Sequence, residues 1–156
     1  MTPEDRAQLR DLLADQRVLS LAVLVDGAPY VGLLPFAMLP GFSAALVHAS
    51  ALAKHTAGLK EGAPFSLLIH QPDHADADPQ QLPRVTLQGH VRLVGKESAE
   101  YMTGRSLYIA KFPDSQQTFD LGDFNLYALV IESGRFVAGF GRIYNVTSEM
   151  LRNLDE

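Results

Sequence analysis

The 156-residue sequence contains no cysteine, which excludes a disulfide framework, a thiol nucleophile and a metal site built from thiolates. Basic residues are also few: 13 Lys and Arg stand against 18 Asp and Glu, and no basic run offsets the net charge of -5. This balance argues against nucleic acid as a partner. No apolar run approaches membrane-spanning length, and the first five residues are polar and acidic, unlike a signal peptide. We therefore expect a cytoplasmic protein that binds neither nucleic acid nor membrane.

The rest of the composition fits a single domain over residues 1–156, because 47% hydrophobic residues suffice for one core and no internal repeat divides the chain. Antiparallel hairpins with inserted helices favour a mainly β protein, a barrel with helical additions. Helices are expected to start at Thr2 and to cover 98–112, and strands to cover 18–25, 30–39, a segment ending near 48, 65–69, 85–94, and a last hairpin of 124–132 and 135–140 around Ser133-Gly134.

The segment from Ser50 to Thr56 lies between two apolar runs, where a strand should give way to a short helix. Ser50 is placed to cap this helix and to leave neighbouring amides free, and Lys54 lies one turn further on the same face. A hydroxyl, free N–H groups, the positive end of a helix dipole and an ammonium would then converge, as a bound phosphate requires. The alternative is an ordinary helix start with a solvated lysine.

A second polar row follows the strand that starts after Pro83. Arg84, Thr86 and Gln88 alternate with apolar residues, so they share one face of the strand. A guanidinium, a hydroxyl and an amide in a row can grip a phosphate at one end and hydrogen-bond a polar heterocycle further along. The alternative is an ordinary solvated strand face.

Two other signals are interpreted as structural. The histidines and aspartates of the 70–83 segment lie in a proline-flanked acidic stretch without ligand spacing, which indicates a surface loop rather than a metal site. Gly139-Phe140-Gly141 lacks the third glycine of a dinucleotide fingerprint and has no strand–helix–strand unit around it.

Taken together, four segments resemble the FMN-binding split-barrel family related to pyridoxamine 5'-phosphate oxidase, and in particular its branch of haem-utilisation proteins. They are residues 27–36, 47–56, 84–89, and 122–124 together with 139–142. The resemblance implies an antiparallel split barrel of six to seven strands that binds FMN at the interface of a homodimer and acts on a small-molecule substrate.

The resemblance also implies a set of cofactor-binding residues. Gly32, Leu33, Leu34, Pro35 and Phe36 would line the flavin ring. Around the phosphate we expect Ser50, Lys54 and His55, with Ala49 and Ala53 allowing close backbone approach; Arg84 and Gln88 would add polar contacts, and Phe140, Gly141 and Arg142 would reach the flavin from the partner subunit.

Three differences between this sequence and the family pattern argue against particular activities. Gly32 stands where the oxidases carry an arginine, and only Arg142 is present where a histidine and an arginine would bind the substrate phosphate, which argues against oxidation of pyridoxamine phosphate. No histidine follows His90, which argues against haem ligation by a C-terminal extension. The hypotheses are an FMN-dependent oxidoreductase with no catalytic residue assigned, a haem-binding or haem-utilisation protein without flavin turnover, and a remnant with a vacant groove.

Overall fold

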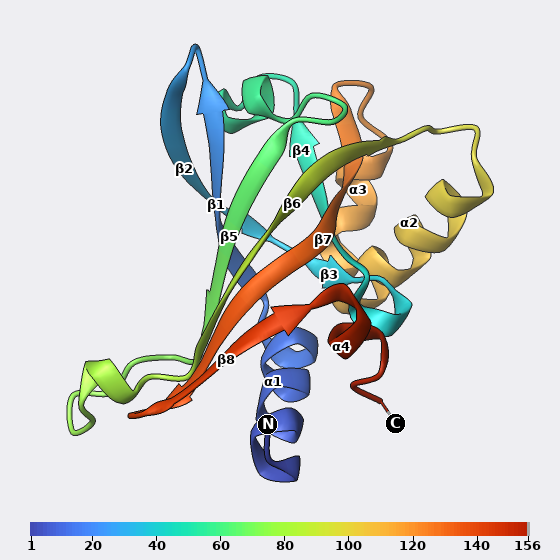
Figure 1. Ribbon diagram of the computed structural model, residues 1–156. Helices are drawn as coiled ribbons and strands as arrows, with labels where there is room; N and C mark the ends of the chain where they lie inside the picture. The colour runs from blue at the N-terminus through green and yellow to red at the C-terminus, as the bar shows by residue number, and fades with distance from the viewer. Residues whose placement is uncertain (156) are drawn as a thin grey trace.

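A computed structural model describes residues 1–155, and its main feature is an eight-stranded antiparallel sheet (Figure 1). The strand order is β2-β1-β5-β6-β7-β4-β3, and β8 pairs with β7, so the sheet is strongly curved but not closed. The strands are β1 (Val18–Val25), β2 (Ala28–Pro35), β3 (Ala37–Met38), β4 (Ala44–Ser50), β5 (Pro64–His70), β6 (Arg84–Val94), β7 (Phe124–Gly139) and β8 (Arg142–Thr147). The predicted split barrel is confirmed, with one more strand than expected.

The helices occupy two places around this sheet. They are α1 (Pro3–Asp15), α2 (Ala99–Lys111), α3 (Gln116–Phe119) and α4 (Ser148–Arg152), with 3-10 turns η1 (Pro40–Phe42), η2 (Lys54–Gly58), η3 (Pro79–Gln81) and η4 (Pro113–Ser115). Figure 1 shows α2 and α3 together beside β4 and β7, and α1 near the opposite end of the sheet. Both long helices start as the sequence predicts: Thr2 Oγ1 accepts from Asp5 N (3.1 Å), and Ser98 Oγ accepts from Tyr101 N (3.2 Å).

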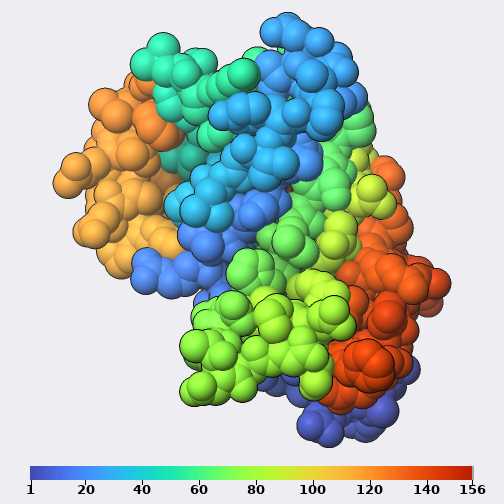
Figure 2. Space-filling model, turned by 90° about the vertical axis from the view of Figure 1, so that its left-hand side faces the viewer, coloured from blue at the N-terminus to red at the C-terminus, as the bar shows by residue number. Residues whose placement is uncertain are grey.

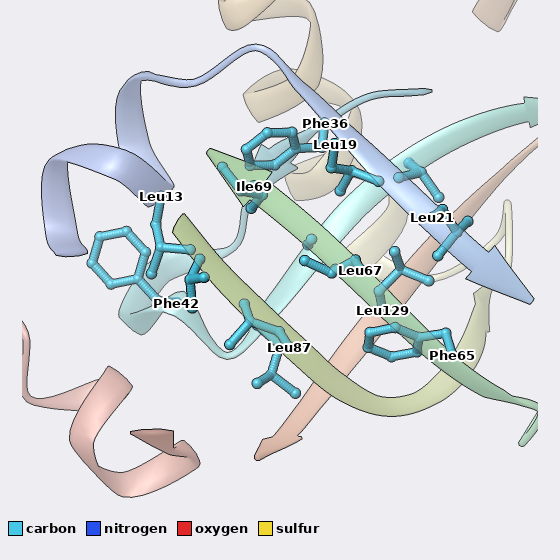
Figure 3. Packing of buried hydrophobic residues seen from close by; sticks show 14 of the residues in the cluster. Leu13, Leu19, Leu21, Phe36, Phe42, Phe65, Leu67, Ile69, Leu87 and Leu129 are labelled. Atoms are coloured by element: carbon cyan, nitrogen blue, oxygen red, sulfur yellow. The ribbon is translucent and has the colours of Figure 1, made fainter. Parts of the chain in front are cut away.

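Two apolar clusters stabilise the fold. The larger one fills the inside of the curved sheet, where residues of α1, β1, β5, β6 and β7 meet (Figure 3). The smaller one lies between β4, β7 and α2 and includes Leu46, Tyr108 and Leu126. Gly104 in α2 permits this contact, because a Cβ there would lie 2.9 Å from Leu126 Cδ2. β4 is therefore covered on both faces, as its almost entirely buried residues indicate.

The predicted hairpin around Ser133-Gly134 is wrong. β7 runs without a turn from Phe124 to Gly139, and the last hairpin instead joins β7 to β8 through Gly141, whose φ is +75°. Gly134 has another purpose: a Cβ there would lie 2.5 Å from Thr86 O on β6. The glycine thus allows two strands to approach closely and does not reverse the chain.

None of the helices within residues 1–155 is long and apolar enough to span a membrane.

Candidate functional site

Ser50 is the last residue of β4 and pairs with Phe124 of β7, so it continues the sheet. The helix that follows is η2, a five-residue 3-10 turn that begins only at Lys54, and its N-cap residue Ala53 makes no side-chain hydrogen bond. The prediction that Ser50 caps a helix is therefore wrong. Strand pairing with β7 holds the backbone of Ser50 extended, and the chain must turn before it can become helical.

The amides after Ser50 are occupied. Leu52 N donates to Ser50 Oγ (3.1 Å), Ala53 N to Ser50 O (3.1 Å) and Ala51 N to Asp123 O (2.7 Å). Ser50 Oγ itself donates to Asp123 Oδ2 at 3.0 Å. The hydroxyl therefore faces a carboxylate at the position where the sequence predicts a phosphate.

Lys54 and His55 turn toward β2. Lys54 Nζ lies 4.9 Å from the centre of the Tyr30 ring, a cation–π contact. His55 packs over Gly32, where an added Cβ would lie 3.0 Å from His55 Nδ1. Burial lowers the pKa of His55 below its ordinary value of 6.5, so the imidazole is neutral at physiological pH.

The β2 residues divide between surface and core. Leu33 is 68% exposed and Pro35 is also exposed, whereas Leu34 is 3% exposed and Phe36 is fully buried. Phe36 lies under the ammonium of Lys111, 4.3 Å from its ring centre. Two of the five predicted ring-lining residues thus belong to the core of the chain, as does Ala49, while Ala53 is half-buried beside η2.

Arg84 lies far from Ser50 within one chain. Arg84 pairs with Val137 near one end of β7 and Ser50 with Phe124 at the other end, on the order of 40 Å along the strand. The Arg84 guanidinium donates to the carbonyls of Gln80 (3.3 Å) and Leu82 (2.9 Å). It thereby holds the 71–83 segment, whose largely exposed residues agree with the predicted surface loop.

Gln88 is exposed beside a shallow hollow of about 230 Å³, which residues of β1, β2 and β5 also line. This volume is below the range of about 300–1,000 Å³ that is usual for small-molecule sites.

Phe140, Gly141 and Arg142 form the turn between β7 and β8. Phe140 is 79% exposed. Arg142 is bound within its own chain: Nη1 donates to the fully buried Asp5 Oδ1 at 2.5 Å, and Nη2 to Ala138 O at 3.2 Å. Figure 1 shows this turn beside the 71–83 loop, at the opposite end of the sheet from η2.

Sequence reasoning missed the environment of His48. The ring is 8% exposed and stacks on Phe119, with ring centres 3.7 Å apart. Thr118 Oγ1 donates to Ser115 O (2.8 Å), so it accepts from His48 Nδ1 (3.2 Å). The proton therefore lies on Nδ1, and the Nε2 lone pair has no partner within residues 1–155. The two-residue spacing of His48 and Ser50 on one strand was the available signal.

The arrangement offers binding groups rather than a nucleophile. Ser50 Oγ donates to the Asp123 carboxylate, and a carboxylate is a much weaker base than the imidazole that activates a catalytic serine. Residues 1–155 contain no group of three His, Asp or Glu side chains that could hold a metal ion. The surface of Tyr30, Gly32, Lys54 and His55, called here the β2–η2 surface, combines a cation, a neutral imidazole and an aromatic ring. Leu33 points to the opposite face of β2, because successive side chains of a strand alternate between its two faces.

Comparison with known proteins gives a family match. The family model described as pyridoxamine 5'-phosphate oxidase matches residues 6–138. No curated protein sequence matches the chain.

Several solved structures have the same fold. A haem-binding protein from Mycobacterium smegmatis is 26% identical with a TM-score of 0.83; the match covers 97% of this chain and 61% of that one, so this chain spans about three fifths of its length. HutZ, the haem storage protein from Vibrio cholerae, is 20% identical with a TM-score of 0.72, over 81% and 89% of the two chains. An FAD- and haem-binding protein from Mycobacterium smegmatis is 19% identical with a TM-score of 0.67, over 94% and 76%.

Proposed function

Because the chain belongs to the pyridoxamine 5'-phosphate oxidase family, we propose that it is a flavoprotein that binds FMN as a homodimer and acts as an oxidoreductase on a small molecule. One structural neighbour is named as an FAD- and haem-binding protein, which supports a flavin as the ligand class. The observation on this chain that carries the proposal is the β2–η2 surface. Figure 2 shows β2 uncovered across one face of the molecule, with η2 beside it.

The β2–η2 surface suits a flavin in two respects. Tyr30 offers an aromatic contact to the flavin ring system, and Lys54, which lies over the Tyr30 ring, offers a positive charge to the anionic end of the ligand. His55, held neutral by burial, can give or accept one hydrogen bond without adding charge. Close packing of His55 on Gly32 fixes η2 against β2, so these groups keep their relative positions.

Homodimer formation would cover the outer face of β1 and β2, opposite the face that carries Tyr30 and Gly32. The apolar side chains of β5 and β7 are not available to a second copy, because Phe65, Leu67, Ile69, Tyr127 and Ile131 are all buried within the chain. Four exposed apolar side chains lie together on β1 and β2 instead: Val18 (47%), Leu24 (52%), Val31 (63%) and Leu33 (68%). Burying such a group against a second copy is favourable, and two-fold pairing is the commonest way to do so.

A bound flavin supplies hydride or electron transfer from its own ring. The residues of this chain then have only to bind, orient and shield it. Lys54 neutralises negative charge, Tyr30 and His55 orient the ring, and a partner subunit excludes water. Such a role agrees with the lack of an activated nucleophile at Ser50.

Haem binding without flavin turnover is the second candidate. It is favoured by the names of the Mycobacterium smegmatis and Vibrio cholerae neighbours, the first of which is 26% identical to this chain.

The absorption spectrum of the purified protein separates the two candidates. Flavin absorbs near 450 nm and haem near 400 nm, about the values of the free chromophores. The protein is then titrated with FMN, FAD, riboflavin and haem, and any co-purified ligand is identified by mass. We expect flavin absorbance and tighter binding of FMN than of FAD. Haem binding with no affinity for any flavin would overturn the flavoprotein proposal.

A further inference from the structure

The hydrogen bond between Ser50 and Asp123 places a carboxylate beside the start of η2, where the sequence predicts a phosphate. Ser50 Oγ has one proton, and it is donated to Asp123 Oδ2 at 3.0 Å. One lone pair of the same oxygen is used by Leu52 N at 3.1 Å. A phosphate oxygen only accepts hydrogen bonds, so it could engage this hydroxyl only by displacing Asp123.

The position of Asp123 is held by the backbone as well as by its side chain. Ala51 N donates to Asp123 O at 2.7 Å, which continues the β4–β7 pairing by one step beyond Ser50 and Phe124. Asp123 therefore stays beside Ser50 even when its side chain rotates. A phosphate carries about -1.5 to -2 charges at pH 7, and bringing it to Ser50 would set it against this carboxylate.

We propose that Asp123 is a specificity-determining residue that offsets the attraction of Lys54 for a phosphate, so that FMN binds with little advantage over its uncharged analogue riboflavin. This inference rests on the proposed flavin function, which it deepens. It predicts that the affinities for FMN and riboflavin are similar, because attraction of the phosphate to Lys54 is offset by its repulsion from Asp123. Asp123 acts on the ligand by charge and by holding the Ser50 proton, not by taking part in chemistry.

The test compares FMN with riboflavin, which differ only in the phosphate. Asp123→Asn keeps the shape and removes the charge, Asp123→Glu keeps the charge, and Asp114→Asn on η4 removes the same charge from an exposed position elsewhere. We expect Asp123→Asn to tighten FMN about tenfold and to leave riboflavin unchanged, because one repulsion between exposed charges is of that order. Asp123→Glu and Asp114→Asn should keep the wild-type ratio of the two affinities.

A second measurement keeps the inference testable if no flavin binds. Melting temperatures are taken in inorganic phosphate and in chloride at equal ionic strength. Phosphate should raise the melting temperature of Asp123→Asn and not that of wild type or Asp114→Asn. The inference is overturned if phosphate acts equally on all variants, or if the FMN-to-riboflavin ratio is the same in wild type and Asp123→Asn. If neither riboflavin nor FMN binds any variant, the proposed flavin function is overturned. The melting temperatures in phosphate then test the role of Asp123 by themselves.

Discussion

Arg142 at the start of β8 binds Asp5 in the first turn of α1, with 2.5 Å between Nη1 and Oδ1, and Tyr144 OH donates to the other oxygen at 2.6 Å. The carboxylate is fully buried, whereas the Arg142 side chain is 46% exposed. This contact joins segments near the two ends of the chain and fixes the first turn of α1 to β8. It also commits Arg142 to its own chain, although the family resemblance implies a role toward the flavin of the partner subunit.

Asp5→Asn should lower the melting temperature at pH 7 because it leaves Arg142 facing a neutral group. The hydrogen bond from Tyr144 is the main cause that lowers the pKa of Asp5 below its ordinary value of 3.8, with Arg142 adding to it. The stabilisation is therefore complete above about pH 4 and is lost as the pH falls through the lower folded-state pKa. Melting curves at pH 7 and pH 3 should differ less in the variant than in wild type. Asp11→Asn, at an exposed ion pair with Arg10, serves as the control and should change little.

His48→Phe should remove part of the pH dependence of stability above pH 4. Burial lowers the pKa of His48 from 6.5 to about 4, so between these values the unfolded chain binds a proton that the folded protein does not. Wild type should lose about 2–3 kcal/mol of unfolding free energy from pH 7 to pH 4, and the variant should keep most of it. Phenylalanine retains the stack on Phe119 and removes the unpartnered Nε2, so stability at pH 7 should stay within about 1 kcal/mol. Urea denaturation at both pH values measures this. The exposed His74→Gln is the control, and an equal effect there would contradict the assignment.

Gly134→Asn and Gly141→Asn should differ sharply. Asparagine suits a true turn with positive φ, as at Gly141, where nothing lies within 4 Å of an added Cβ. At Gly134 the new side chain meets β6 and should cost about 2–3 kcal/mol. Chemical denaturation of both variants gives the difference. If both variants lost equally little stability, the predicted hairpin around Ser133-Gly134 would be supported after all.

Leu33→Glu should convert a homodimer into a monomer, because a charge would replace an apolar group in the proposed interface. Light scattering should give about twice the 17.1 kDa chain mass for wild type and the single mass for the variant. Met102→Glu, at a similarly exposed residue of α2, should remain dimeric. A wild-type mass of one chain at micromolar concentration contradicts the dimer.

Lys54→Ala should weaken FMN by about 1.5–3 kcal/mol, the scale of a charged hydrogen bond. Fluorescence titration measures it, with Lys60→Ala, exposed just after η2, as the control. Arg84→Ala should have a similar effect only if the partner subunit brings its Arg84 to the site, because within one chain this residue holds the 71–83 loop. Unchanged affinity in both variants would remove Lys54 and Arg84 from the site.

Local signals predicted the parts of the fold that depend on neighbouring residues. The 18–25 strand and the Thr2 cap both follow from residues close in sequence. The Ser133-Gly134 hairpin failed because a glycine that permits close strand approach looks the same in sequence as a glycine that turns the chain. Only the register of β6 against β7 distinguishes the two cases.

The candidate site was less predictable for a related reason. The sequence indicates which residue types could meet a phosphate, and Lys54 and His55 do lie together against β2. The sequence does not indicate that the Ser50 hydroxyl donates to Asp123, since that hydrogen bond depends on the pairing of β4 with β7. Arg84 and Ser50 could each bind a phosphate, and yet they pair with opposite ends of β7.

The long strand β7 also determines when the fold can be completed during synthesis. β4 has only the two-residue β3 beside it until β7 is made, and β6 and β8 pair with β7 as well. A nascent chain that ends before residue 124 therefore exposes two unpaired strand edges, one on β6 and one on β4, and such edges can pair with other chains. Because the contacts that remove them join distant parts of the sequence, final folding should be slow compared with helix formation and should follow synthesis of the segment from residue 124 onward.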